Sequence, residues 1–231
     1  MSQIRDHIEI VQDRINRAAL KAGTDASSIR LVAVSKTKPI EMVEEAIEAG
    51  MTEFGENRVQ EARQKYDHID HEVAWHLIGP LQTNKAKHAV HIFDMIQSID
   101  RLSLAEELQK RLTPLQKDLA ILIQVKTSDE ESKSGIEPER ALDLIEQIRA
   151  FPNLSIQGLM TIPAYSKNPD DARPSFNTLR LLQEKTASYQ FPDVSMDILS
   201  MGMTNDFEVA IEEGANMVRV GTAIFGARSK H

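Results

Sequence analysis

Eight short runs of nearly continuous hydrophobic residues recur along the chain, and each has the length of a buried strand. Stretches with apolar residues at helical spacing separate them, as in Met42, Val43, Ala46 and Ile47. Strands that are apolar at almost every position and alternate with helices are typical of a parallel sheet covered on both faces. The predicted strands lie at 31–35, 52–55, 75–78, 95–99, 119–125, 155–161, 194–201 and 216–220.

Eight β/α units in 231 residues predict an α/β protein with one (β/α)8 barrel, a single domain over residues 1–231. A doubly wound open sheet is the alternative, but no glycine-rich nucleotide fingerprint follows the first strand. Gly50 and Gly214 are expected to end helices, and the segment 163–174 to be the least structured stretch. An extra helix precedes the first strand, with an apolar stripe formed by Ile4, Ile8, Val11, Ile15, Ala18 and Ala19.

Composition removes several classes of protein. The chain has no cysteine, which excludes a disulfide scaffold and a thiolate site. It has no run of about 18 apolar residues, and its N-terminus carries charges where a signal peptide needs an apolar core, so we expect a soluble cytoplasmic protein. The net charge is −8 and the basic residues are scattered, which argues against nucleic-acid and membrane partners.

Lys36 is the candidate reactive group, because it follows the first predicted strand in the phrase LVAVSKTKP. Strand alternation places Lys36 on the same face as Val32 and Val34, at the barrel end where such enzymes carry their chemistry. Burial there favours the neutral amine, which can attack a carbonyl and form a Schiff base. A lysine that simply reaches water past its stem is the alternative interpretation of this motif alone.

The ends of the last two strands offer a candidate anion site. Ser200 stands near Gly202 after the seventh strand, and Gly221 precedes Thr222 after the eighth. Loops at these positions are the usual phosphate site of barrel enzymes, although turn glycines are the ordinary alternative. A Schiff-base lysine together with a phosphate site indicates one ligand, an aldehyde that bears a phosphate.

Several long motifs resemble the pyridoxal 5'-phosphate homeostasis protein family, the YggS/PROSC group. The resemblance covers residues 31–228 and implies a fold type III pyridoxal phosphate barrel, similar to the barrel domain of alanine racemase, with the cofactor on Lys36. The motifs are VAVSKTKP, FGENRVQE, WHLIGPLQTNK, ESKSGI, GLMTIP, LSMGMTNDFEVAIEEGA and VRVGTAIFGAR.

The resemblance also implies further cofactor-binding residues. It places Arg219 beside the pyridine nitrogen, Asn57 and His76 in the barrel mouth near the ring, and Met160 near the lysine. The cofactor phosphate is implied to lie on Ser200, Gly202, Gly221 and Thr222. One departure is visible, because Lys126 occupies a position after the fifth strand where the family commonly has asparagine, and it adds a positive charge.

We expect binding of pyridoxal 5'-phosphate rather than catalysis. Arg219 cannot hold a proton for the ring nitrogen as a carboxylate does, so the cofactor stays a poor electron sink. None of Tyr66, Tyr165 and Tyr189 falls at a predicted strand end, although Tyr165 follows the sixth strand closely. The sequence therefore predicts a monomeric carrier that holds the cofactor as a lysine aldimine and supplies apo pyridoxal phosphate enzymes, with effects on amino-acid and keto-acid balance.

Other functions and sites remain as alternatives. A small racemase-like pyridoxal phosphate enzyme is the first, and a phosphosugar aldolase with a Schiff-base lysine is the second. His88 and His91 lie three residues apart but lack a carboxylate at useful spacing, so we expect no metal site. Lys133 in ESKSGI is a candidate for receiving the cofactor in transit, with a plain surface lysine as the alternative.

Overall fold

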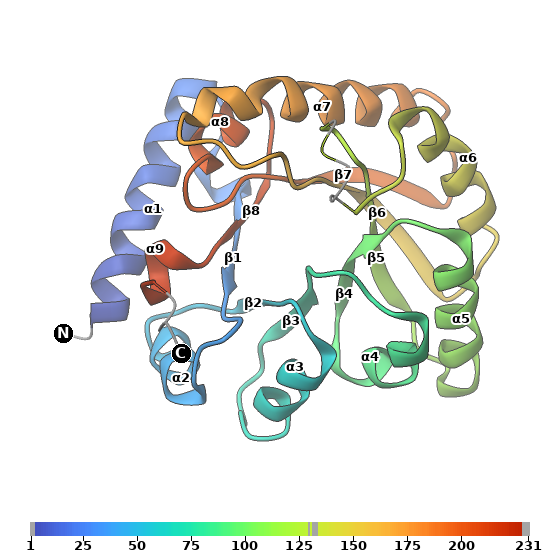
Figure 1. Cartoon of the computed structure of the whole chain (residues 1–231), viewed down its shortest axis with the longest axis horizontal. Helices are drawn as coiled ribbons and strands as arrows, with labels where there is room; N and C mark the ends of the chain where they lie inside the picture. The colour runs from blue at the N-terminus through green and yellow to red at the C-terminus, as the bar shows by residue number, and fades with distance from the viewer. Residues whose placement is uncertain (1–2, 129, 131–133, 228–231) are drawn as a thin grey trace.

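The strands close into a parallel barrel in which each strand pairs with the next along the chain, and the last pairs with the first. The computed structural model describes residues 3–128, 130 and 134–227. The closed barrel confirms the predicted fold and excludes the open sheet (Figure 1). Its strands are β1 (Arg30–Val34), β2 (Glu53–Glu56), β3 (Ala74–Leu77), β4 (Met95–Ile99), β5 (Leu119–Gln124), β6 (Leu154–Met160), β7 (Val194–Ser200) and β8 (Met217–Val220).

Helices surround the barrel, as Figure 1 shows. Gly50 and Gly214 follow two of these helices with φ of +100° each, the left-handed conformation predicted for a helix end. The helices are α1 (Gln3–Ala22), α2 (Ile40–Glu48), α3 (Val59–Tyr66), α4 (Ala86–Ile92), α5 (Leu102–Leu112), α6 (Pro138–Ile148), α7 (Arg173–Ala187), α8 (Phe207–Glu212) and α9 (Thr222–Phe225).

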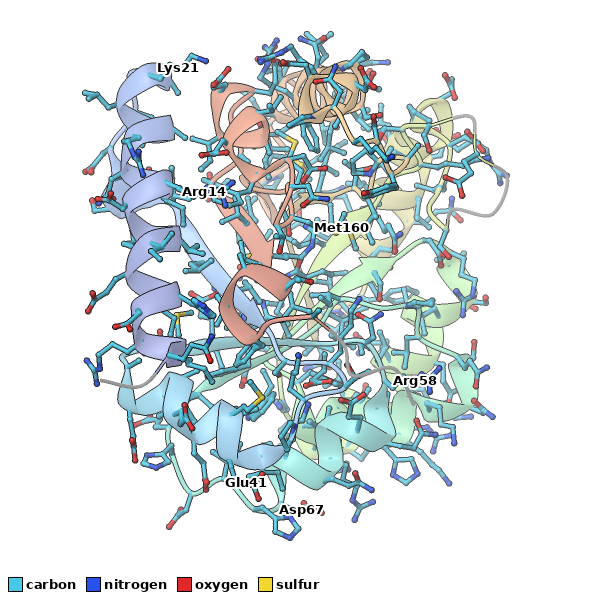
Figure 2. The ribbon with its side chains drawn as sticks, turned by 60° about the vertical axis from the view of Figure 1, so that its left-hand side comes forward. Arg14, Lys21, Glu41, Arg58, Asp67 and Met160 are labelled. Atoms are coloured by element: carbon cyan, nitrogen blue, oxygen red, sulfur yellow. The ribbon has the colours of Figure 1, made fainter. Side chains whose placement is uncertain are left out.

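The extra helix α1 packs against α8 and α9, which flank β8 in the chain, and against α2, which follows β1. All six residues of its predicted apolar stripe are buried. Arg14, which Figure 2 labels on α1, makes a two-point ion pair with Glu208 of α8 at 3.1 and 2.8 Å, and it stacks over the Phe207 ring. His7 Nδ1 lies 2.9 Å from the carbonyl oxygen of Ile224 in α9. The helix therefore joins the two ends of the fold.

The segment 163–174 is more ordered than its composition indicates. A short 3-10 helix, η4 (Pro169–Ala172), occupies its second half, and α7 begins directly afterwards at Arg173. Pro169 and Pro174 each stand in a first helical turn, where a missing N–H costs nothing. Proline here marks helix starts, whereas the composition of the segment predicts a loop.

Inward-facing side chains fill the barrel in layers. An apolar layer is formed by Val32, Met95, Leu122, Met160, Ile198 and Met217. Met160 is labelled within the fold in Figure 2. Polar side chains share this interior, because His76, Gln97, Ser200 and Arg219 are also buried. Among the residues that the structure describes, no helix combines the length and the hydropathy needed to cross a membrane.

Candidate active site

A cavity of about 650 Å³ opens at the carboxyl ends of the strands, where parallel barrels carry their chemistry. This volume lies in the usual range for small-molecule sites. Five of the nine predicted site residues line it, namely Lys36, Asn57, Arg219, Gly221 and Thr222. Strand-end position therefore brought together residues that are up to 186 positions apart in the sequence.

Lys36 lies in the turn that follows β1, and it is partly exposed to the cavity. The next residue, Thr37, has a φ of +64°, a left-handed conformation that is strained for a β-branched residue. Two contacts hold this turn: the Thr37 N–H donates to Glu61 Oε1, and Lys65 Nζ donates to the Ser35 carbonyl at 2.7 Å. The backbone on both sides of Lys36 is therefore fixed.

A largely buried cluster formed by Lys65, Glu56 and Glu61 supports that turn. Lys65 is 3% exposed, and its ammonium contacts Glu56 Oε1 at 2.5 Å and Glu61 Oε1 at 3.0 Å. The Ser35 hydroxyl donates to the same Glu56 oxygen at 2.7 Å. Burial raises the pKa of Glu56, and Lys65 opposes that rise. Glu56 Oε2 is buried without a hydrogen-bond partner, so the carboxyl depends on Lys65.

Arg219 projects from β8 into the floor of the cavity. Its guanidinium donates to Ser200 Oγ at 2.5 Å and to the Thr161 carbonyl at 2.8 Å. Burial lowers the pKa of Arg219 to about 10, and Asp206 opposes this shift. The side chain therefore stays a cation and a hydrogen-bond donor at neutral pH.

Close backbone packing explains two glycines of the site. A Cβ atom on Gly79 would lie 2.5 Å from the Asn57 carbonyl oxygen, so this glycine lets β3 approach the loop that carries Asn57. Gly202 has a φ of +91°, and a Cβ there would lie 2.6 Å from the Ala210 Cβ. Gly202 therefore serves the packing of α8 against β7.

Four predicted site residues lie outside the set that lines the cavity: His76, Met160, Ser200 and Gly202. Met160 belongs to the apolar layer of the barrel. His76 and Ser200 are 1% and 0% exposed, and both hydrogen-bond to Gln97 in the barrel interior. Their direct contact with a cofactor stays a prediction, and in this structure Ser200 contacts the Arg219 guanidinium inside the barrel.

Comparisons with known proteins agree on one family. The alanine racemase N-terminal domain family matches residues 9–229 of the chain. A pyridoxal phosphate homeostasis protein of Vibrio alginolyticus is 44% identical, with 99% of each chain covered. The structure of PipY from Synechococcus elongatus with pyridoxal phosphate bound is 34% identical and superposes with a TM-score of 0.83, covering 97% of this chain and 100% of PipY.

The chain belongs to the pyridoxal phosphate homeostasis protein family. This confirms the resemblance found in the sequence. An alanine racemase of Clostridium difficile shares the fold, with 12% identity and a TM-score of 0.77 over 97% of this chain. The match covers only 58% of the racemase, so this chain corresponds to part of that enzyme.

Several polar residues of this family member's cavity were not predicted as site residues. Asp206 lines the cavity, accepts a hydrogen bond from the Met203 N–H at 2.6 Å, and has its pKa raised by burial. Thr204 and Tyr165 also line the cavity, and Tyr165 is 75% exposed. Only the position of Asp206 just before a helix was a usable signal, because Asp favours that cap position.

The residue that departs from the usual family pattern is paired. Lys126 Nζ lies 3.3 Å from Glu137 Oε1, and Lys126 is absent from the cavity lining. The Glu137 carboxylate therefore partly balances the positive charge of Lys126. Lys133, the candidate for receiving the cofactor, lies outside the residues that the structure describes.

His76 should make this family member sensitive to acid. Burial lowers the pKa of His76 to about 3 from 6.5. The unfolded chain binds a proton at this position below about pH 6.5, whereas the folded protein binds it only near pH 3. Stability therefore falls as the pH decreases through this window, by about 3 kcal/mol between pH 7 and pH 4.

Urea unfolding of the wild type and of His76→Gln at pH 7 and pH 4 measures this effect. The variant should lose about 3 kcal/mol less than the wild type on acidification, because its side chain does not titrate. The other histidines are the same in both proteins, so their contributions to the loss of stability cancel in the comparison. Equal losses in the two proteins would contradict a neutral buried His76.

Proposed function

We propose that the protein binds pyridoxal 5'-phosphate as a Schiff base on Lys36, stores the cofactor in this form and releases it to other proteins. The observation that carries the proposal is the cavity that brings the Lys36 amine and the Arg219 guanidinium to the same space. The relative PipY, 34% identical over nearly its whole length, has pyridoxal phosphate bound. Storage and release of this cofactor would affect amino-acid and keto-acid balance.

The donors in the cavity match the groups of this ligand. Lys36 supplies an amine for the aldehyde, and Arg219 supplies a donor for the pyridine nitrogen. Thr222 supplies a hydroxyl beside Gly221 for the phosphate. The cavity lining contains two basic side chains, Lys36 and Arg219, and one carboxyl group, Asp206, whose pKa is raised by burial. This balance of charges favours a bound anion.

The character of Arg219 supports a carrier rather than an enzyme. When bound, pyridoxal phosphate stabilises carbanions best if its ring nitrogen is protonated. Arg219 keeps its own proton at neutral pH, since its pKa is about 10, and it offers only donors to the ring nitrogen. This arrangement leaves the nitrogen as an acceptor, and proton abstraction from a bound amino acid then lacks an electron sink.

One observation favours a racemase-like enzyme as the second candidate. Tyr165 lines the cavity, although the sequence placed no tyrosine at a strand end. A tyrosine within reach of the ligand could act as a base. Its 75% exposure argues against this role, because a side chain in solvent is not held by packing at the reacting atom.

Cofactor transfer tests the proposal. The loaded protein, freed of unbound cofactor, is mixed with an apo pyridoxal phosphate enzyme, whose activity should return. The pure loaded protein should show negligible racemase, transaminase or decarboxylase turnover with amino acids. A sample of Lys36→Ala treated in the same way serves as the control for free cofactor and should restore little activity.

Two outcomes would decide against the carrier. If the apo enzyme stays inactive while the loaded protein keeps its cofactor, the protein does not release it. Robust turnover that is lost in both Lys36→Ala and Tyr165→Phe would favour the racemase-like enzyme. Tyr165→Phe should otherwise leave transfer unchanged.

A further inference from the structure

A file of buried polar side chains runs through the barrel interior from the cavity to the opposite end. Arg219 Nη1 contacts Ser200 Oγ at 2.5 Å, and Ser200 Oγ contacts Gln97 Oε1 at 2.6 Å. Gln97 Nε2 then lies 2.9 Å from His76 Nδ1. All four residues are at most 2% exposed, so no bulk water competes for these bonds.

The donor and acceptor roles along this file follow from its first member. Arginine has no acceptor, so Arg219 must donate to Ser200. The single proton of the Ser200 hydroxyl is then available for the Gln97 oxygen, which fixes that amide with its nitrogen toward His76. Every hydrogen bond therefore points away from the cavity.

The hydrogen bond from Gln97 also determines the tautomer of His76. Because Gln97 donates to His76 Nδ1, that nitrogen carries no proton, and the neutral ring holds its hydrogen on Nε2. Nε2 faces Glu53 Oε2 at 3.5 Å. Glu53 is itself held by Arg30 through two contacts of 2.9 Å. The file thus ends at a fixed carboxylate near the amino ends of the strands.

From this geometry we infer that Gln97 and His76 are positioning residues that orient the Arg219 guanidinium through Ser200. Gln97 holds the Ser200 hydroxyl as an acceptor toward Arg219, and the guanidinium cannot rotate without breaking the bonds to Ser200 and to the Thr161 carbonyl. The Ser200 hydroxyl donates its proton to Gln97, so it cannot donate to a phosphate while this hydrogen bond is intact. The orientation exists without any ligand, whereas its importance for binding rests on the proposed function.

Nuclear magnetic resonance of the cofactor-free protein tests the orientation directly. The guanidinium Nη signals of Arg219, assigned with Arg219→Lys, should be resolved in the wild type because rotation is restricted. In Gln97→Leu they should merge, with rotation roughly tenfold faster, because the Ser200 hydroxyl loses its bond to Gln97 and no longer holds its acceptor side toward Arg219. Met217→Leu is the matched control, since it removes only the sulfur that Gln97 Nε2 contacts at 3.2 Å.

A second variant keeps the test independent of folding defects. Gln97→Glu still accepts from Ser200 but offers no donor to His76, so His76 should move its proton from Nε2 to Nδ1 while the Arg219 signals stay resolved. Nitrogen-15 shifts of the imidazole report this change of tautomer. Unchanged Arg219 signals in Gln97→Leu, or an unchanged His76 tautomer in Gln97→Glu, would overturn the inference.

Ligand binding then separates this inference from the proposed function. The wild type should prefer pyridoxal phosphate over an analogue with carbon in place of the ring nitrogen, and Gln97→Leu should lose roughly tenfold of this preference. If the wild type binds both ligands equally, the proposed contact of Arg219 with the ring nitrogen is wrong. A preference that Gln97→Leu keeps in full would count against the positioning role.

Discussion

Replacing Lys36 by alanine should abolish the visible absorption band of the loaded protein and the covalent adduct that borohydride traps. Lys36 lines the cavity, and the backbone on both sides of it is fixed by Glu61 and Lys65. Without the amine, the ligand keeps only its noncovalent contacts, and no imine forms. Peptide mapping of the reduced wild type should place the adduct on Lys36.

Neighbouring lysines provide the controls for this result. Lys38 donates to the carbonyl oxygens of Phe225, Gly226 and Ala227 at 2.8 to 2.9 Å, so these three hydrogen bonds occupy its Nζ. Lys126→Ala should keep the full adduct, because Lys126 does not line the cavity. An adduct found mainly on Lys38 or Lys133 would contradict the assignment.

Replacing Lys65 by methionine should cost about 3–5 kcal/mol of unfolding free energy, the usual effect of leaving a buried charge without its partner. Lys65 and Glu56 are 3% and 0% exposed, and Glu56 Oε2 is buried without a hydrogen-bond partner. Urea unfolding at pH 7 measures the loss. Arg63→Ala, which removes an exposed ion pair with Asp67 on the same helix, should cost about 1 kcal/mol or less.

Acidification should reduce the effect of Lys65→Met. Burial raises the pKa of Glu56 above 4.5 in the folded protein, so protonation of this carboxyl favours the folded state. The cost of burying the ionised carboxylate grows as the pH rises through the folded pKa. The variant should therefore lose less stability near pH 5 than at pH 7. The double variant Lys65→Met/Glu56→Gln should also recover part of the loss, and an equal cost in single and double variants would contradict a charge effect.

The hydrophobic pattern was sufficient for the fold because buried parallel strands are apolar at almost every position. Six consecutive residues of β5, Leu119–Gln124, show this in the sequence, and the left-handed Gly50 and Gly214 mark helix ends. Proline was harder to interpret. Pro169 and Pro174 start helices, but the same residue type is equally common in loops.

Position along a strand predicted only part of the site. Lys36 follows from its strand end and from alternation, and Arg219 was implied by the family resemblance, whereas the depth of His76 and Ser200 inside the barrel has no signature in the sequence. The bond between Ser200 and Gln97 joins residues 103 positions apart, so no local motif indicates it. Lys65 and Glu56 look like ordinary surface charges of an amphipathic segment until the fold buries them.

The contacts of α1 also determine when the barrel can be completed during synthesis. Arg14 and Glu208 are 194 residues apart, and His7 and Ile224 are 217 apart. The first helix therefore cannot complete its native contacts until α8 and α9 have been synthesised, and part of its apolar stripe lacks its native partners until then. Closure of such distant contacts is intrinsically slow, so the nascent chain is a candidate for chaperone binding over most of its translation.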